Sequence, residues 1–272
     1  MGARLLRNRS SRASFLCYHS IAPAGPRYLT VASDLFERQL ALLRSRGLRS
    51  GGLDDLAAVA AGERSGRLVF LTFDDGFRDN YETALPILRA AGERAFVFVL
   101  PPLVDNGAAL AWPEVAAEHR SHPETMRSVT WPMLEEMKEG GFEVGSHGLT
   151  HAHLPRLDGE ALREELWESR ARIRDRLGSC DTLAYPFGEW SPEVAAAARE
   201  CGYRFAFSLP TGTGQRAASP HAIPRINVDY RDGGRRFEAK LGGVGKRVLL
   251  SPEVAALRRA LRGVKTRRAA AQ

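Results

Sequence analysis

The sequence predicts an α/β fold in which buried parallel strands alternate with amphipathic helices. Short apolar runs such as 68–73 and 95–100 recur along the chain, as expected for strands that are buried on both faces. Between them lie stretches such as 34–46 and 159–177, which carry apolar residues at helical spacing. The 272 residues are enough for one large barrel domain with a sizeable core.

The predicted elements alternate along most of the chain. Strands are expected at 14–18, 68–73, 95–100, 142–145, 182–185, 203–208 and 223–228. Helices are expected at 34–46, 54–61, 80–91, 131–139, 159–177 and from 191 onward. Ser33, Asn80 and Asp158 are of the residue types that cap helix starts. The connection 103–127 is unusually long for a compact domain, which is typical of a segment that shapes or covers a site.

Two adjacent carboxylates, Asp74 and Asp75, end the strand 68–73 and precede Gly76. Asp and Gly are also common in turns, so this feature alone does not separate a turn from a site. The carboxyl end of a strand is, however, where α/β folds place their chemistry.

A pair of histidines follows another predicted strand, 142–145. His147 and His151 are four residues apart, a spacing that places both on one face of a helical turn and lets them share one metal ion. The alternative is a surface pair at a helix start. Two clusters at two strand tips are a stronger signal than either cluster alone.

The segments Thr72-Phe73-Asp74-Asp75-Gly76 and Ser146-His147-Gly148-Leu149-Thr150-His151 together resemble two motifs of the polysaccharide deacetylases, the NodB-homology carbohydrate esterases. Leu183 to Gly188 resembles the family's aromatic-proline segment in a weaker form. The similarity runs from about residue 15 to 228. It implies a distorted (β/α) barrel of the NodB-homology deacetylase type at 14–230, between a basic segment at 1–13 and a basic extension at 231–272.

The resemblance also implies roles for individual residues. Asp75, His147 and His151 would bind a divalent metal, Zn²⁺ in the first place, with Co²⁺ or Ni²⁺ as alternatives, and Asp74 would be the general base. The backbone N–H of Phe187 would stabilise the oxyanion. Tyr185 and Trp190 are candidates for stacking against a sugar ring, with plain core packing as the alternative.

The sequence departs from the family pattern at the acid and at the residue that braces the base. Well-known members carry an arginine two residues before the proline, where this chain has Ala184, and a late Asp and Trp segment that is missing here. Arg225 stands where the family has its acidic histidine, and arginine stays charged near neutral pH. Arg225 could brace the base or bind an anionic substrate group. His19 is the first candidate for the acid, with Asp74 itself and His221 as alternatives.

The net charge of +7 comes from the two ends of the chain. Residues 1–13 carry four arginines and residues 254–272 six basic residues, with no acid in either stretch. Within the second stretch, residues 254–264 predict a basic amphipathic helix that could lie on an anionic membrane, although packing on the barrel is the alternative. Neither stretch has aromatic residues interleaved with its basic ones, so nucleic acid is not favoured as a partner. The N-terminal segment carries no apolar leader, and the three cysteines are widely spaced; both features predict a cytoplasmic protein. Cys17 is expected to be a core residue.

The sequence therefore predicts a metal-dependent hydrolase that removes N-acetyl groups from an amino sugar in a polysaccharide or lipid-linked glycan precursor, as in exopolysaccharide biosynthesis. One alternative is a metal-dependent amidase or deformylase with another amide substrate. Another is a catalytically silent carbohydrate-binding relative. The presence of Asp74 argues against the silent relative, because metal and sugar binding alone would not require a base.

Overall fold

The computed structural model describes residues 13–63, 67–210, 219–251, 253 and 254. Within them, nine strands form one sheet in which every pairing is parallel, in the order β10-β9-β8-β7-β6-β5-β1-β11 with β4 beside β5. The strands are β1 (Ser14–Tyr18), β4 (Arg49–Ser50), β5 (Leu68–Phe73), β6 (Ala95–Val99), β7 (Phe142–Ser146), β8 (Thr182–Ala184), β9 (Phe205–Ser208), β10 (Ile223–Pro224) and β11 (Ile226–Asn227). Two further short strands, β2 (Ser20–Ile21) and β3 (Thr30–Val31), pair with each other.

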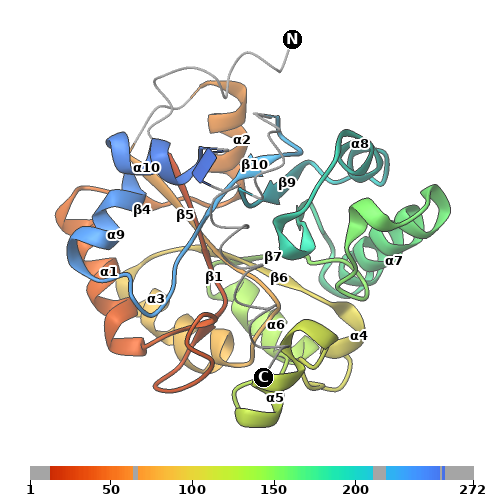
Figure 1. Cartoon of the computed structure of the whole chain (residues 1–272), viewed down its shortest axis with the longest axis horizontal. Coiled ribbons are helices and arrows are strands. Elements are labelled where there is room, and N and C mark those ends of the chain that lie inside the picture. Colours follow the sequence, from red (N-terminus) through yellow and green to blue (C-terminus); the bar gives the residue numbers. More distant parts are fainter. Residues whose placement is uncertain (1–12, 64–66, 211–218, 252, 255–272) are drawn as a thin grey trace.

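Helices surround the strands, which cross the middle of the molecule in Figure 1. They are α1 (Ser33–Ser45), α2 (Leu53–Ala61), α3 (Leu85–Ala91), α4 (Pro101–Val104), α5 (Ala116–Ser121), α6 (Trp131–Glu139), α7 (Gly159–Leu177), α8 (Pro192–Glu200), α9 (Gly234–Leu241) and α10 (Gly243–Leu249). Tighter or wider turns occur at Pro113–Val115, Leu154–Arg156, Pro186–Gly188 and Asn80–Ala84. Among the described helices, none is both long and apolar enough to cross a membrane.

The short stretch 223–227 closes the sheet into a barrel. Ile223 of β10 pairs with Phe207 of β9, and Ile226 of β11 pairs with Leu16 of β1. The single strand expected at 223–228 is therefore two short strands with different neighbours, and Arg225 lies at the switch. The predicted (β/α) barrel is confirmed, because β10 ends the sheet on one side, β11 ends it on the other, and one residue separates these two strands in the chain.

Phenylalanine side chains fill the inside of the barrel. Phe15, Phe70, Phe96 and Phe207 belong to one buried cluster, in which the Phe15 and Phe70 rings stack with centroids 4.8 Å apart. Leu56 and Val59 of α2 belong to the same cluster, so this helix packs against the amino-terminal end of the barrel. The opposite end, where the strands finish, carries the polar side chains described below.

A second and larger cluster lies between the strands and the outer helices. Leu16 and Tyr18 belong to this cluster, whereas Phe15 belongs to the inner one, as the alternation of side chains along a strand requires. Phe237 of α9 is fully buried in the outer cluster and Leu241 packs against it. The first part of the charged extension after residue 230 therefore packs on the barrel.

The helix starts match the predicted capping residues only in part. The Asp158 side chain accepts hydrogen bonds from the N–H groups of Glu160 and Ala161, as predicted. Ser33 is instead the first residue of α1, which follows Ala32. Asn80 begins a π-helical turn that precedes α3, and its side chain donates to the carbonyl of His19. Pro86 follows this turn and lies in the first turn of α3, where its missing N–H costs no helical hydrogen bond.

A buried carboxylate, Asp79, ties the segment after β1 to this π-helical turn. It accepts hydrogen bonds from the Ser20 hydroxyl at 2.7 Å and the Ile21 N–H at 2.8 Å. Burial disfavours its charge and raises its pKa to about 7, although these hydrogen bonds act in the opposite direction. Asp79 thereby holds His19 and its neighbours at the carboxyl end of the barrel.

The raised pKa of Asp79 predicts that the folded protein loses stability as pH rises. The unfolded chain releases this proton near pH 3.8, so the stabilising effect is complete below that pH and is lost as pH rises through about 7. Between pH 5 and 8 the wild type should lose about 3 kcal/mol of unfolding free energy relative to Asp79→Asn. Urea unfolding at both pH values measures the difference. Glu135→Gln, which removes an exposed carboxylate on α6, should keep the wild-type pH dependence; equal slopes for the wild type and Asp79→Asn would contradict the prediction.

Candidate functional site

The two adjacent aspartates point to different places because the backbone turns sharply between them. β5 is buried along its whole length, and Asp75, which follows it with Asp74, has a φ of 70°. Such a left-handed conformation is costly for an aspartate and is found mainly at functional sites. Gly76 follows with a φ of 66°, and a Cβ there would lie 2.8 Å from Val99 Cγ1, so only glycine fits.

Asp75 and the two predicted histidines form one buried cluster. Asp75 Oδ1 lies 3.2 Å from His147 Nε2 and 3.4 Å from His151 Nε2. The three possible ligand atoms lie within 4.8 Å of one another. His147 Nδ1 lies 2.9 Å from the Ala184 carbonyl oxygen, which can only accept, so Nδ1 carries a hydrogen, and in the neutral ring Nε2 has the lone pair that a metal ligand needs. One carboxylate and two imidazoles are a common ligand set for a divalent metal, and the tautomer of His147 suits that purpose.

The environments of the two imidazoles differ. Burial favours the neutral form and lowers the pKa of His151 despite its hydrogen bond to Asp75. At His147 burial acts in the same direction, but the charge of Asp74 and the hydrogen bond to Asp75 outweigh it and raise the pKa. The same two imidazoles hold the pKa of Asp75 far below its usual range, against the effect of burial. The carboxylate is therefore ionised in the folded protein.

The spacing predicted that both histidines lie on one helical turn. They lie instead on the loop after β7. His147 directly follows the strand and His151 has a φ of 61°. The loop between them is held by Glu165 of α7, which accepts hydrogen bonds from the N–H groups of Leu149 at 2.8 Å and Thr150 at 2.6 Å. A single buried carboxylate thus fixes the loop that brings both imidazoles to Asp75.

Asp74 points into the barrel and forms a bidentate ion pair with Arg225. Its two oxygens lie 2.6 and 2.7 Å from Arg225 Nη1 and Nη2. Nη1 also donates to the Thr72 hydroxyl at 2.9 Å. Burial alone would raise the pKa of Asp74, but the charge of Arg225, followed by that of His147, holds it below its ordinary value. Asp74 is consequently ionised and fixed in one orientation.

Arg225 itself is fully buried, with its guanidinium over the rings of Phe98 and Phe207 at 5.6 and 5.7 Å. Of the two roles that the sequence left open, the geometry favours bracing of Asp74. It disfavours direct contact with a substrate, because the residue has no exposed surface. The arginine that well-known relatives carry at position 184, at the end of β8, is thus replaced by one from the chain between β10 and β11.

His19 and Cys17 complete the surroundings of Asp74. A ring nitrogen of His19, Cys17 Sγ and an Asp74 oxygen lie within 4.8 Å of one another. The His19 Nδ1 atom is buried and has no hydrogen-bond partner among the described residues. Cys17 donates to Asp74 Oδ2 at 3.2 Å, so it is more than the simple core residue that the sequence suggested. Burial raises the pKa of this thiol, so it stays protonated.

Phe187 has a φ of 60°, and its backbone N–H has no hydrogen-bond partner among the described residues. Its ring lies edge-on to His151, with centroids 4.5 Å apart, and stacks on His153 at 3.9 Å. His153 Nδ1 also lies 2.8 Å from Glu189 Oε2. These contacts fix an unpaired donor beside the Asp75 cluster.

Two other predicted residues lie away from the reacting groups. The prediction that Tyr185 stacks on a sugar is wrong, because this residue is fully buried and its hydroxyl donates to the His221 carbonyl. The His221 ring bonds the carbonyl of Tyr203, which precedes β9, so His221 lies toward the opposite end of the barrel and cannot be the acid. Trp190 is half-buried and packs against the outer core cluster, and its contact with a substrate stays a prediction.

Sequence reasoning missed Glu165 and Trp112. Glu165 lies on the same stripe of α7 as the buried Leu162 and Ser169, a spacing that could have identified it. The Trp112 indole stacks on the His151 ring, with centroids 4.1 Å apart. Its place in the long connection was the signal, since that segment was expected to shape a site.

The comparisons with known proteins point to one family. Residues 61–206 match the family model described as polysaccharide deacetylase. The Bacillus subtilis (strain 168) protein YxkH, whose name assigns it provisionally to the polysaccharide deacetylases, is 25% identical over 234 residues, which cover 85% of this chain and 76% of that protein. The part of this chain that the family model matches includes Asp74, Asp75, His147 and His151, but neither His19 nor Arg225.

Solved structures share the fold. The deacetylase PplD from Streptococcus pyogenes, in complex with acetate, has a TM-score of 0.70 at 21% identity, over 85% of this chain and 98% of that one. IcaB from Ammonifex degensii has a TM-score of 0.64 at 23% identity, over 85% and 97%. A family model that covers more than half of the chain, around a site of the expected composition, leads to one conclusion. The chain belongs to the polysaccharide deacetylase family and is a hydrolase of amide bonds.

Proposed function

We propose that this protein removes an N-acyl group, acetyl in the simplest case, from an amino sugar in a polysaccharide or a lipid-linked glycan precursor, with the help of a divalent metal. The convergence of Asp75, His147 and His151 beside the braced carboxylate of Asp74 carries the proposal. Zn²⁺ suits this ligand set best, with Co²⁺ or Ni²⁺ as alternatives. Such a metal would polarise the acyl carbonyl and make a water molecule easier to deprotonate.

The residues around the cluster supply the remaining steps of amide hydrolysis. Asp74, ionised and oriented by Arg225, accepts the proton of the attacking water. The free N–H of Phe187 donates to the oxygen of the acyl group as negative charge develops on it. His19 is the candidate that returns a proton to the leaving amine, because one of its ring nitrogens lies near Asp74 and its buried Nδ1 has no hydrogen-bond partner among the described residues. Each group thus has one task at a stated atom.

Release of acetate from a panel of N-acetylated oligosaccharides and lipid-linked sugars tests the proposal. The protein is assayed as purified, after chelation, and after addition of Zn²⁺, Co²⁺ or Ni²⁺. Release that disappears on chelation and returns with metal supports a metal-dependent deacetylase. Metal binding without release from any sugar would favour an amidase with another substrate. No metal binding would overturn the role of Asp75 and the histidines.

A role in exopolysaccharide synthesis stays a prediction, because the likeness to solved structures such as IcaB concerns the fold alone. The basic helix expected at 254–264 lies almost wholly outside the described residues, so its contact with a membrane stays a prediction, as does a cytoplasmic location.

Glu165 is expected to set the affinity for metal, because it fixes the loop between the two histidines. Glu165→Ala should weaken Zn²⁺ binding by about 10- to 100-fold, the usual cost of removing a group that orients metal ligands. Glu165→Gln should retain most of the affinity, since its amide oxygen can still accept from Leu149 and Thr150. Competition with a chromogenic chelator measures the affinity. Glu164→Ala, an exposed neighbour on α7, is the matched control, and wild-type affinity in Glu165→Ala would disprove the role.

A further inference from the structure

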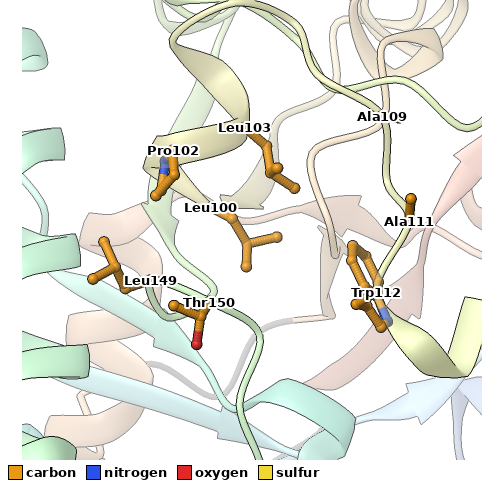
Figure 2. Close-up of a pocket in the computed structure, with 8 residues that line it drawn as sticks. All are labelled: Leu100, Pro102, Leu103, Ala109, Ala111, Trp112, Leu149 and Thr150. Carbon is orange, nitrogen blue, oxygen red and sulfur yellow. The ribbon is translucent and has the colours of Figure 1, made fainter.

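An apolar cavity of about 320 Å³ lies beside the proposed metal cluster (Figure 2). Leu100, Pro102 and Leu103 line it from the end of β6 and from α4. Trp112 and two alanines line it from the long connection, and Leu149 and Thr150 from the loop between the histidines. Figure 2 shows these three segments around one central space.

This cavity shares its walls with the reacting centre. Trp112 lines the cavity and stacks on the His151 ring, with centroids 4.1 Å apart. Thr150 directly precedes His151 in the chain. Leu100 directly follows Val99, whose carbonyl accepts the His147 N–H at 2.8 Å. A group in the cavity would therefore be attached close to an acyl carbon held at the cluster, and not at the far side of a sugar ring.

The lining matches hydrocarbon better than carbohydrate. Among the described lining residues, threonine is the one with a hydroxyl, and the Thr150 hydroxyl already donates to Glu165. Sugar hydroxyls buried here would lose hydrogen bonds to water without replacement, which is costly. Leucine, proline and alanine side chains offer methyl and methylene groups, against which an alkyl chain is buried favourably.

The volume exceeds what an acetyl group needs. A methyl group is of roughly the size of a water molecule, which takes up about 30 Å³ in the liquid, so the cavity could hold roughly ten such groups. We propose that the protein accepts N-acyl groups longer than acetyl, with the carbonyl at the metal cluster and an unbranched alkyl tail in this cavity. The inference rests on the proposed function and narrows its substrate class.

The first arm of the test is a series of N-acylglucosamines with acetyl, butyryl, hexanoyl and octanoyl groups. With metal-loaded protein, kcat/KM should rise about fourfold per added methylene until the cavity is full, since each buried methylene contributes about 0.8 kcal/mol. The octyl glycoside of N-acetylglucosamine carries its alkyl chain on C1 and not on the acyl group, and it should show no gain. The double variant Ala109→Leu/Ala111→Leu, which fills the cavity, should abolish the preference for long acyl chains. Ala117→Leu, on the exposed surface of α5, is the matched control.

The second arm needs no turnover. Isothermal titration of metal-loaded protein with octanoate and with acetate should show at least tenfold tighter binding of octanoate, lost in the double variant. This affinity ratio decides the inference, and equal affinities would overturn it even if the acetyl sugar is hydrolysed. Tight octanoate binding without hydrolysis of any acyl sugar would keep the cavity assignment and overturn the proposed function. The two failures are therefore distinguishable.

Discussion

Replacing Asp74 with asparagine is expected to lower turnover of an acylated amino sugar by about 10²- to 10⁴-fold while the protein still binds metal. Asparagine has nearly the shape of aspartate but cannot take a proton from water. Asp75, His147 and His151 are unchanged in this variant. Acetate release and metal content, measured on the same preparation, separate loss of the base from loss of the site.

Two controls belong with this variant. Asp75→Asn removes the carboxylate between the two imidazoles and should lower metal affinity itself. Because Asp74→Asn leaves the buried Arg225 without its counter-charge, urea unfolding must show that the variant is folded at the assay temperature. A folded, metal-bound Asp74→Asn protein with wild-type turnover would remove Asp74 from the mechanism.

Replacing Arg225 with methionine is expected to damage both stability and activity. Asp74 would remain buried without its partner, and breaking a buried ion pair from one side usually costs about 3–5 kcal/mol. The pKa of Asp74 should rise, since the charge of Arg225 is the largest influence that lowers it. Urea unfolding measures the first effect, and the pH dependence of kcat/KM measures the second. Turnover should then require a higher pH than in the wild type.

A second-site variant tests the geometry of this ion pair. Well-known members of the family carry their arginine at the position of Ala184, which lies in the same interior cluster as Phe98 and Phe207. Ala184→Arg should therefore restore part of the stability and activity that Arg225→Met loses. Arg225→Met with wild-type stability and an unchanged pH profile would show that Asp74 needs no arginine.

The parts of the site that the sequence predicted are those set by local order. Asp74, Asp75 and His147 directly follow strands whose apolar runs are evident, and parallel strands bring their carboxyl ends to one edge. The meeting of these side chains at one edge could therefore be predicted from position, whereas their roles as metal ligands came from the resemblance to the family. The same reasoning failed at His151, where a loop with a positive φ replaces the expected helical turn. Its shape depends on Glu165, a residue in a different element.

The remaining parts depend on contacts between distant segments. The partner of Arg225 is decided by where the chain leaves β9 and joins β1, which no local pattern shows. Trp112 reaches His151 from a connection without regular periodicity. Tyr185 was a candidate for stacking on a sugar because it belongs to the aromatic-proline segment, but its side chain is fully buried in the core. The types of residue and their spacing along the chain predicted the reacting groups. The orientation of each side chain could be known only from the folded structure.

The place of Arg225 has a consequence for the nascent protein. The residue stands in the last short stretch to join the sheet, and it braces a carboxylate that was synthesised long before it. Until that stretch docks between β9 and β1, Asp74 has no brace and the hydrolase is incomplete. An unfinished chain, or one clipped before residue 223, is consequently a poor enzyme even with its metal ligands intact. The enzyme therefore becomes active only after residue 225 has been synthesised and the barrel has closed.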